Sequence, residues 1–454
     1  MPLAPTATRG LKARTLGHAC LAIYRDGERP LLLTDPWLVG SVYWRSWWLQ
    51  HYPDAAEIAW LATAAHVYVT HEHPDHFHMP SIRRLGAGPT YLFPALAERG
   101  FLGHLGERGY RAEIAPPLRW LPLSEGVSIL SIPAWNDDSL LLVDTPNALI
   151  LNLNDAKPLP PVLRAISRAA DRIAKPRVLL CSYSPASLVN SFVDDNGVVA
   201  LRSPRHYVEY ACRLCDRLGI DHYLPFASQA VFRRADSAWA NEYGTTYDDL
   251  RRYWRSRARL LPPYTTLDLD DFSYVAVPAG EYRPIDPATL ARRTAERAIA
   301  EEEAEIAPAE TALLERKLNA FRWLLRLLFR RGFSFRLGAR RLRYNPGQGR
   351  LEDVTAEEVG AADGGAVGDF VVDVPKATMK EALRNNHVSD LGITMFVRIR
   401  LLRAVDPRKA YGLFVLFQFD DYGHLAGVRP FLRWLGRGLR FTLVPHLPSP
   451  PPQR

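Results

Sequence analysis

The chain has 454 residues with 47% hydrophobic side chains and a formal net charge of +8, a composition that excludes an intrinsically disordered protein. Its length favours two or three domains. The four cysteines provide no disulfide framework, the first residues lack the apolar core of a secretion signal, and no apolar run could span a membrane. These features favour a cytoplasmic protein, and no nucleic-acid-binding motif is present.

The first half of the chain alternates short predicted strands with predicted helices. Residues 16–24 and 30–34 are expected to pair as a hairpin around Asp26-Gly27. Further strands are predicted at residues 65–69, 127–132, 140–143, 148–153, 178–182 and 223–226, and helices at 81–85, 161–173 and 205–218. Strands that alternate with helices in two sheets fit an αβ/βα sandwich.

The second half differs in composition and is predicted to form a smaller α+β domain. We expect a first domain at residues 1–285, an acidic helical linker at 286–312 and a basic C-terminal domain at 313–454. Strands are predicted within this last domain at 369–374 and 394–402.

A basic segment extends from residue 316 to residue 344 and contains no acidic residue. Arg322, Arg326 and Arg330 recur at helical spacing beside an apolar face, which predicts an amphipathic helix. We favour a helix docked on its own domain with a solvated basic face. A membrane surface, an anionic ligand or an acidic partner are the alternatives.

The segment Thr70-His71-Glu72-His73-Pro74-Asp75-His76 directly follows a buried-type strand. Alternate side chains of an extended segment share a face, so His71 and His73 can point at one ion. Pro74 turns the chain and lets Asp75 and His76 approach a neighbouring point. Imidazole and carboxylate groups suit zinc, iron or manganese. The alternative is a solvated histidine-rich turn, but the position after a buried strand favours a metal site.

Other polar residues end apolar strands and are further candidates for this site. Asp155 ends the strand at 148–153, although it could also cap a turn before Pro158. Asp137 is an oxygen ligand candidate. His18 and Asp35 are predicted to support a ligating histidine, with a structural role equally open for His18.

For two other groups of residues, core packing is the alternative to a functional role. Cys212 and Cys215 form a lone CxxC in a helical pattern, for which core packing is favoured over a metal or redox role. The aromatic residues Tyr43, Trp44, Trp47 and Trp48 could line a substrate pocket, although aromatic core packing is the more frequent use.

The H-x-H-x-D-H pattern of residues 71–76 resembles the signature loop of the metallo-β-lactamase superfamily. This resemblance implies a four-layer αβ/βα sandwich, two divalent metal ions, a catalytic Asp75, and Asp155 as a carboxylate that bridges both ions. Hydrolytic members carry a third histidine near residues 132–139, where this chain has Asn136, Asp137 and Asp138. A final histidine is also missing from residues 223–229. An oxygen-richer site would favour iron or manganese over zinc, or a single ion.

Longer segments resemble CMP-N-acetylneuraminate hydroxylase beyond its Rieske domain, roughly over residues 12 to 275. The segments that match in order are Gly17-His18-Ala19-Cys20, Asp35-Pro36-Trp37-Leu38-Val39-Gly40, Trp47-Trp48-Leu49, residues 71–76 and Pro225-Phe226-Ala227. The residues ahead of this part hold no pair of Cys-x-His motifs. Hydroxylation would therefore need an external reductase or a separate Rieske protein.

Three functions are consistent with these patterns. The first is a hydrolase that uses metal-bound hydroxide to attack a small-molecule substrate. We also consider that this substrate is anionic. The second is a di-iron oxygenase or hydroxylase component. The third is a non-catalytic scaffold whose basic segment binds an acidic partner.

Overall fold

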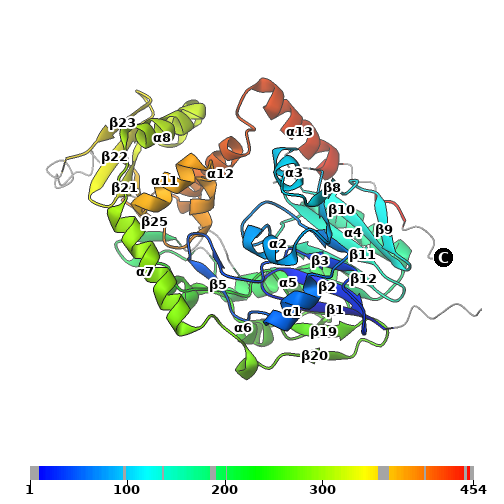
Figure 1. Cartoon of the computed structure of the whole chain (residues 1–454). Helices are drawn as coiled ribbons and strands as arrows, with labels where there is room; N and C mark the ends of the chain where they lie inside the picture. Colours follow the sequence, from blue (N-terminus) through cyan, green and yellow to red (C-terminus); the bar gives the residue numbers. More distant parts are fainter. Residues whose placement is uncertain are drawn as a thin grey trace, which may run out of the picture.

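Two sheets packed face to face form the larger part of the molecule (Figure 1). The computed structural model describes residues 10–95, 99–134, 137–184, 191–200, 202–355, 368–402, 405–443 and 447–449. The first sheet has the order β20 (Tyr274–Ala276), β19 (Thr265–Asp268), β1 (Leu11–Leu16), β2 (Cys20–Arg25), β3 (Leu32–Thr34), β6 (His66–Tyr68), β7 (Thr90–Phe93) and β8 (Arg111–Ile114). The second has the order β18 (Arg259–Leu260), β16 (His222–Pro225), β13 (Arg177–Cys181), β12 (Leu149–Asn154), β11 (Ser139–Asp144), β10 (Val127–Pro133) and β9 (Trp120–Ser124).

Helices cover the outer face of each sheet. The first sheet packs against α1 (Ala55–Leu61), α2 (Met79–Leu85) and α3 (Arg99–Gly106), and the second against α4 (Pro160–Ile173), α5 (Pro204–Leu218) and α6 (Tyr247–Tyr253). A separate apolar core fills the space between the sheets. The predicted four-layer αβ/βα sandwich is therefore confirmed.

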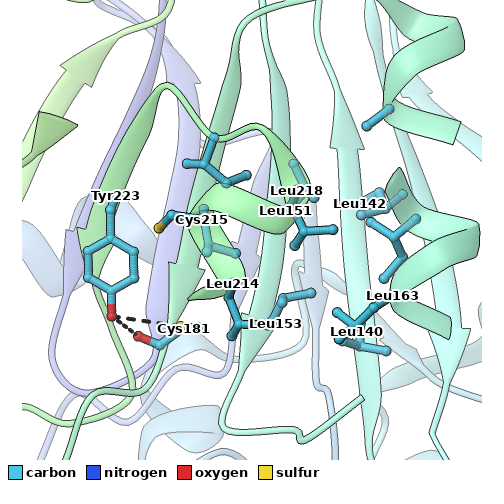
Figure 2. Close-up of a cluster of buried hydrophobic side chains, with 14 of the residues drawn as sticks. Leu140, Leu142, Leu151, Leu153, Leu163, Cys181, Leu214, Cys215, Leu218 and Tyr223 are labelled. Atoms are coloured by element: carbon cyan, nitrogen blue, oxygen red, sulfur yellow. Dashed lines mark hydrogen bonds between the residues drawn. The ribbon is translucent and has the colours of Figure 1, made fainter. Parts of the chain in front are cut away.

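Strand β11 shows how the sequence specifies these layers. Leu140 and Leu142 point toward the helices, whereas Leu141 and Val143 pack between the two sheets. Figure 2 shows the helix-facing leucines of β11 and β12 against residues of α4 and α5. A strand that is buried on both faces has a continuous apolar sequence. Its alternate side chains pack in two different cores, one on each side of the sheet. Cys212 and Cys215 lie in the helix-side core, as predicted.

The predicted hairpin around Asp26-Gly27 is confirmed by the antiparallel pairing of β2 with β3, but its first strand begins at Cys20, because a turn separates Leu16, the last residue of β1, from β2. Gly17 has a φ of +54°, and a Cβ atom there would lie 2.5 Å from the carbonyl oxygen of Trp37. Only glycine tolerates both the left-handed backbone and this close approach. The turn places His18 at the end of the sheet.

The C-terminal part forms a third sheet with its own apolar core. Its order is β15 (Gly197–Val198), β14 (Phe192–Asp194), β25 (Arg398–Leu401), β24 (Phe370–Asp373), β21 (Phe333–Leu337), β22 (Arg340–Asn345) and β23 (Arg350–Asp353). Its helices are α8 (Pro308–Ala320), α9 (Arg322–Leu328), α11 (Lys376–Arg384) and α12 (Pro407–Asp421), while α7 (Pro287–Glu303) packs on α11 and α13 (Val428–Leu443) on α4. Residues 192–198 thus join a sheet that otherwise comes from the C-terminal part, so the sandwich and the third sheet are physically linked. The strand predicted at 394–402 is shorter, because residues 394–397 do not pair.

The basic segment is not one amphipathic helix: it comprises the end of α8, the short helix α9 and, beyond them, β21 and most of β22, and Arg330 lies outside α9. The break between the two helices falls at Phe321, which has non-helical dihedral angles. Lys317 is buried and donates to Asp420 and Asp421, and Arg322 donates to the carbonyl oxygen of Pro346. These contacts agree with the favoured interpretation that the segment docks on its own domain.

A small sheet of β4 (Ser41–Val42), β5 (Trp47–Leu49) and β17 (Ala230–Phe232) lies between the sandwich and the C-terminal part. It packs in a cluster that includes Tyr43, Trp47 and Met395. Among the described helices, none combines the length and apolarity needed to cross a bilayer.

Candidate metal centre

Strand ends from both sheets deliver the polar residues to one region. Strands β3, β6 and β7 are parallel, so the residues that follow them meet at the same edge of the first sheet. Asp35 follows β3 and the loop 71–76 follows β6. Asp155 follows β12 of the second sheet. The site therefore lies across the ends of both sheets.

One group of potential ligands comprises His71, His73 and Asp155, whose ligand atoms all lie within 4.8 Å of one another. Nε2 of His71 is 2.8 Å from Nδ1 of His73. Burial lowers the pKa of His73 to about 4, so this imidazole is neutral near pH 7. A neutral imidazole has the lone pair that a metal ion requires.

A second group comprises His18, Asp75 and His76, also within 4.8 Å of one another. Oδ2 of Asp75 lies 3.4 Å from Nε2 of His18 and 3.4 Å from Nε2 of His76. All three side chains are buried. His18, predicted to be a supporting residue, thus lies close enough to Asp75 and His76 to share an ion with them.

The two groups adjoin each other at Asp155. Its Oδ1 atom is 3.7 Å from Nε2 of His76, so this carboxylate of the first group lies next to the second. Three buried atoms here have no hydrogen-bond partner among the described residues: His18 Nδ1, His76 Nε2 and Asp155 Oδ1. Buried polar atoms are rarely left without a partner, so these residues fit bound cations.

The charges of the site are arranged for cations. Burial disfavours ionisation of Asp75, but the imidazoles of His76 and His18 outweigh this effect and hold its pKa well below the ordinary value. Burial of Asp155 is likewise outweighed by His76 and His71, and its pKa falls to about 2. Both carboxylates are therefore anionic near neutral pH.

Further residues orient the imidazoles from behind. Oδ2 of Asp35 is 3.1 Å from Nδ1 of His76, and both atoms of this pair are fully buried. Thr70 fixes the carboxylate of Asp35 through its backbone N–H (2.7 Å) and its hydroxyl (2.9 Å). Oδ1 of Asp138 lies 3.3 Å from Nδ1 of His71. Asp35 thus has the supporting position that the sequence predicted.

Asp137 lies outside both groups. Its Oδ2 atom is 2.5 Å from Nε2 of His424, and its Oδ1 atom is 3.8 Å from Arg437. The neighbouring Asn136 is outside the described residues. A metal-binding role for Asp137 stays a prediction.

A cavity of about 500 Å³ opens beside the ligand groups. His18, His73, Asp75 and Asp155 line it, together with the aromatic residues Tyr43 and Trp47. Its other walls carry cationic and phenolic side chains: Lys157, Arg202, Arg408, Tyr207, Tyr210 and Tyr411. By contrast, Trp48 is buried and is not among the lining residues, and Trp44 bonds to Glu381.

Sequence reasoning missed several of these contacts. The sequence predicted a supporting or structural role for His18 and not a place within a ligand group. Tyr43, which donates to Asp75, and His424, which contacts Asp137, carry no local sequence signal. Two histidines near the segment 223–229 do not supply the missing ligand: His206 is exposed on α5, and His222 stacks on Phe272.

No family model matches the sequence. The chain is 31% identical over 152 residues to the cytidine monophosphate-N-acetylneuraminic acid hydroxylase of Asterias rubens, a match that covers 30% of this chain and 22% of the relative. It is 28% identical over 154 residues to the inactive human protein of that name, covering 31% and 29%. The predicted resemblance is thus confirmed, and the chain spans less than a third of the length of these relatives.

Solved structures give weaker similarity. A CmlA beta-hydroxylase variant has a TM-score of 0.37 and 17% identity, covering 59% of this chain and 55% of its own. A metallo hydrolase of Ignicoccus hospitalis has a TM-score of 0.35 and 14% identity, covering 57% and 97%.

Proposed function

We propose that this chain, with its metallo-β-lactamase-type sandwich, is an enzyme that holds two divalent metal ions and hydrolyses a small anionic substrate. The supporting observation is a pair of three-residue groups, one buried and one partly buried, that adjoin each other at Asp155. Bound zinc, iron or manganese would supply Lewis acidity toward water and toward a substrate oxygen.

Each of the two ions would have its own set of ligands. His71, His73 and Asp155 would hold one ion, and His18, Asp75 and His76 the other, with Asp155 placed to reach both. Asp75 and Asp155 also face the cavity, where an ionised carboxylate can orient the attacking water. The buried setting limits competing water and strengthens these electrostatic interactions.

An anionic substrate is supported by the cationic side chains that line the same cavity as the ligands. Lys157, Arg202 and Arg408 contribute positive charge there. Lys157 donates to the carbonyl oxygen of Asp155 at 2.7 Å and to Ser182 at 3.2 Å, so its ammonium group is held beside the candidate bridging carboxylate. A phosphate or carboxylate would be attracted to these side chains.

A di-iron oxygenase component is the second candidate. It is supported by the sequence match to proteins that are named hydroxylases. In this reading an external reductase or Rieske protein delivers the electrons, and the same two ligand groups hold iron.

Metal content and turnover test these proposals together. Protein purified without chelator is analysed for zinc, manganese and iron by mass spectrometry, then assayed with bis(p-nitrophenyl) phosphate and p-nitrophenyl acetate. Oxygen consumption is measured in parallel with a chemically reduced ferredoxin. Hydrolysis that depends on zinc or manganese supports the first proposal, and two irons with reductant-dependent oxygen uptake support the second. Protein that takes up no metal after reconstitution would contradict both and leave a non-catalytic scaffold.

A further inference from the structure

Residues 43–45 form an unusual left-handed turn beside the metal centre. Tyr43, Trp44 and Arg45 have φ angles of 48°, 52° and 66°. Residues with a Cβ atom adopt this conformation at a cost and seldom in succession. Such backbone persists only where the surrounding contacts enforce it, and it is concentrated at functional sites.

The turn directs the phenol of Tyr43 onto Asp75. The hydroxyl donates to Oδ1 of Asp75 at 2.6 Å, and both side chains are buried. The opposite oxygen, Oδ2, is the atom that lies 3.4 Å from Nε2 of both His18 and His76. One oxygen of the carboxylate is therefore anchored, and the other is presented to the middle of the second ligand group.

Contacts from the C-terminal part hold the turn in place. The indole N–H of Trp44 donates to Glu381 on α11 at 2.9 Å. The hydroxyl of Ser46 donates to the carbonyl oxygen of Thr394 at 2.6 Å, and the indole N–H of Trp47 to that of Ile393 at 3.1 Å.

Helix α7 adds an ion pair to this set. Arg45 lies 3.1 Å from Glu296. The ring of Tyr43 also packs on Trp47, with centroids 4.8 Å apart. Each residue from 43 to 47 thus contacts either the metal loop or an element outside the sandwich.

We propose that Tyr43 is a positioning residue of the metal centre, which fixes Asp75 for the second cation, and that the C-terminal domain is required to hold it there. The inference rests on the metal centre proposed above. It assigns the C-terminal domain a role in metal binding, although its residues supply no member of either ligand group.

The test is a titration of chelator-treated protein with Co²⁺, monitored by calorimetry and by visible d–d absorption. Tyr43→Phe retains the aromatic packing and removes only the donor. We expect two bound ions in the unaltered protein. In the variant, one ion should bind as before and the other roughly 10- to 100-fold more weakly, which is typical for loss of a residue that orients a ligand. The absorption band of the weakened ion should also shift.

Tyr91→Phe is the matched control. Tyr91 is a buried tyrosine whose hydroxyl donates to the carbonyl oxygen of Gly86 at 2.7 Å, away from both ligand groups. The Tyr91→Phe variant should bind Co²⁺ with the same affinity as the unaltered protein. Thermal unfolding of both variants without metal verifies that they fold.

Trp44→Phe tests the contribution of the C-terminal domain and replaces Tyr43→Phe should that variant fail to fold. It removes the bond to Glu381, which Arg297 still pairs at 2.7 Å, and leaves every ligand in place. We expect the same ion to bind several-fold more weakly. Unchanged Co²⁺ binding in Tyr43→Phe would overturn the positioning role, and unchanged binding in Trp44→Phe would overturn the role of the domain. Absence of Co²⁺ binding in the unaltered protein would refute the metal centre itself and this inference with it.

Discussion

Asp35 and His76 form a fully buried pair in which a carboxylate oxygen lies 3.1 Å from Nδ1 of the imidazole. Asp35 has a φ of 40°, and Thr70 holds its carboxylate through two hydrogen bonds. The pair leaves Nε2 of His76 directed at Asp75. Carboxylate partners of this kind fix the tautomer and orientation of a ligating histidine.

Asp35→Asn is expected to weaken metal binding at the second group by roughly 10- to 100-fold. Asparagine tolerates the left-handed backbone, so the loss would reflect the charge and acceptor rather than strain. Competition with a chromophoric chelator measures the affinity. Asp144→Asn, which alters a buried aspartate paired with Lys175 at 2.7 Å, is the control. Equal metal affinity in Asp35→Asn and the unaltered protein would contradict the assigned role.

His71→Ala is expected to abolish metal binding at the first group while the fold survives. The side chain lies in the loop after β6 rather than in a strand or helix, but it is buried and contacts Asp138, so we expect some loss of stability with the fold retained. Metal analysis and circular dichroism measure the two effects. His78→Ala removes a nearby histidine that bonds to Ser81 and belongs to neither group, and it should retain full metal content. Loss of metal in both variants would show that the effect is not specific.

Local patterns predicted the sandwich, and the loop 71–76 does bring its polar residues together after a buried strand. Continuous apolar runs such as that of β11 specify strands buried on both faces, and the spacing of His71 and His73 follows from strand geometry. The position of His18 was not accessible in this way. It depends on a turn at Gly17 that is enforced by the distant carbonyl of Trp37, and single-residue patterns carry no information on such a contact.

Contacts between distant segments account for the other omissions. Asp137 and His424 are separated by 287 positions, and no local motif around either residue predicts their contact. Pairing of β14 with β25 likewise joins residue 192 to residue 399, a choice made by tertiary packing rather than by strand propensity. The contact of Tyr43 with Asp75 was missed for the same reason, because the strained turn of Tyr43 is stabilised by the C-terminal domain.

Replacement of Arg202 and Arg408 by glutamine is expected to weaken inhibition by inorganic phosphate about tenfold, which corresponds to the loss of a charge-assisted contact. Both residues line the cavity of the ligand groups without belonging to them. The measurement is the phosphate concentration that halves the rate with a neutral ester. Arg205→Gln, which removes a surface arginine paired with Glu209, should leave inhibition unchanged. Equal inhibition of all proteins would argue against an anion-binding wall.

Lys317→Met is expected to destabilise the C-terminal domain by about 3–5 kcal/mol, because two buried or half-buried carboxylates lose their cation. Lys317 donates to Asp420 and Asp421 at 2.7 Å each and to Asn386 at 2.6 Å. Urea unfolding measures the change. The adjacent Arg316 is exposed, and Arg316→Met should change stability by less than about 0.5 kcal/mol. A similar small effect in both variants would mean that the buried lysine is not part of a stabilising network.

Asp390 is expected to make stability fall as pH rises. Burial, with the nearby carboxylates of Asp421 and Asp75, raises the pKa of Asp390 from 3.8 to about 8. Between these values the folded chain holds a proton that the unfolded chain has lost, so the free energy of unfolding decreases with increasing pH across that window. Asp390→Asn removes the titration. In chelator-treated protein, the variant should gain stability relative to the unaltered chain between pH 5 and pH 8, on the order of a few kcal/mol. Urea unfolding at pH 5, 6.5 and 8 measures the difference, and a difference that is constant with pH would contradict the raised pKa.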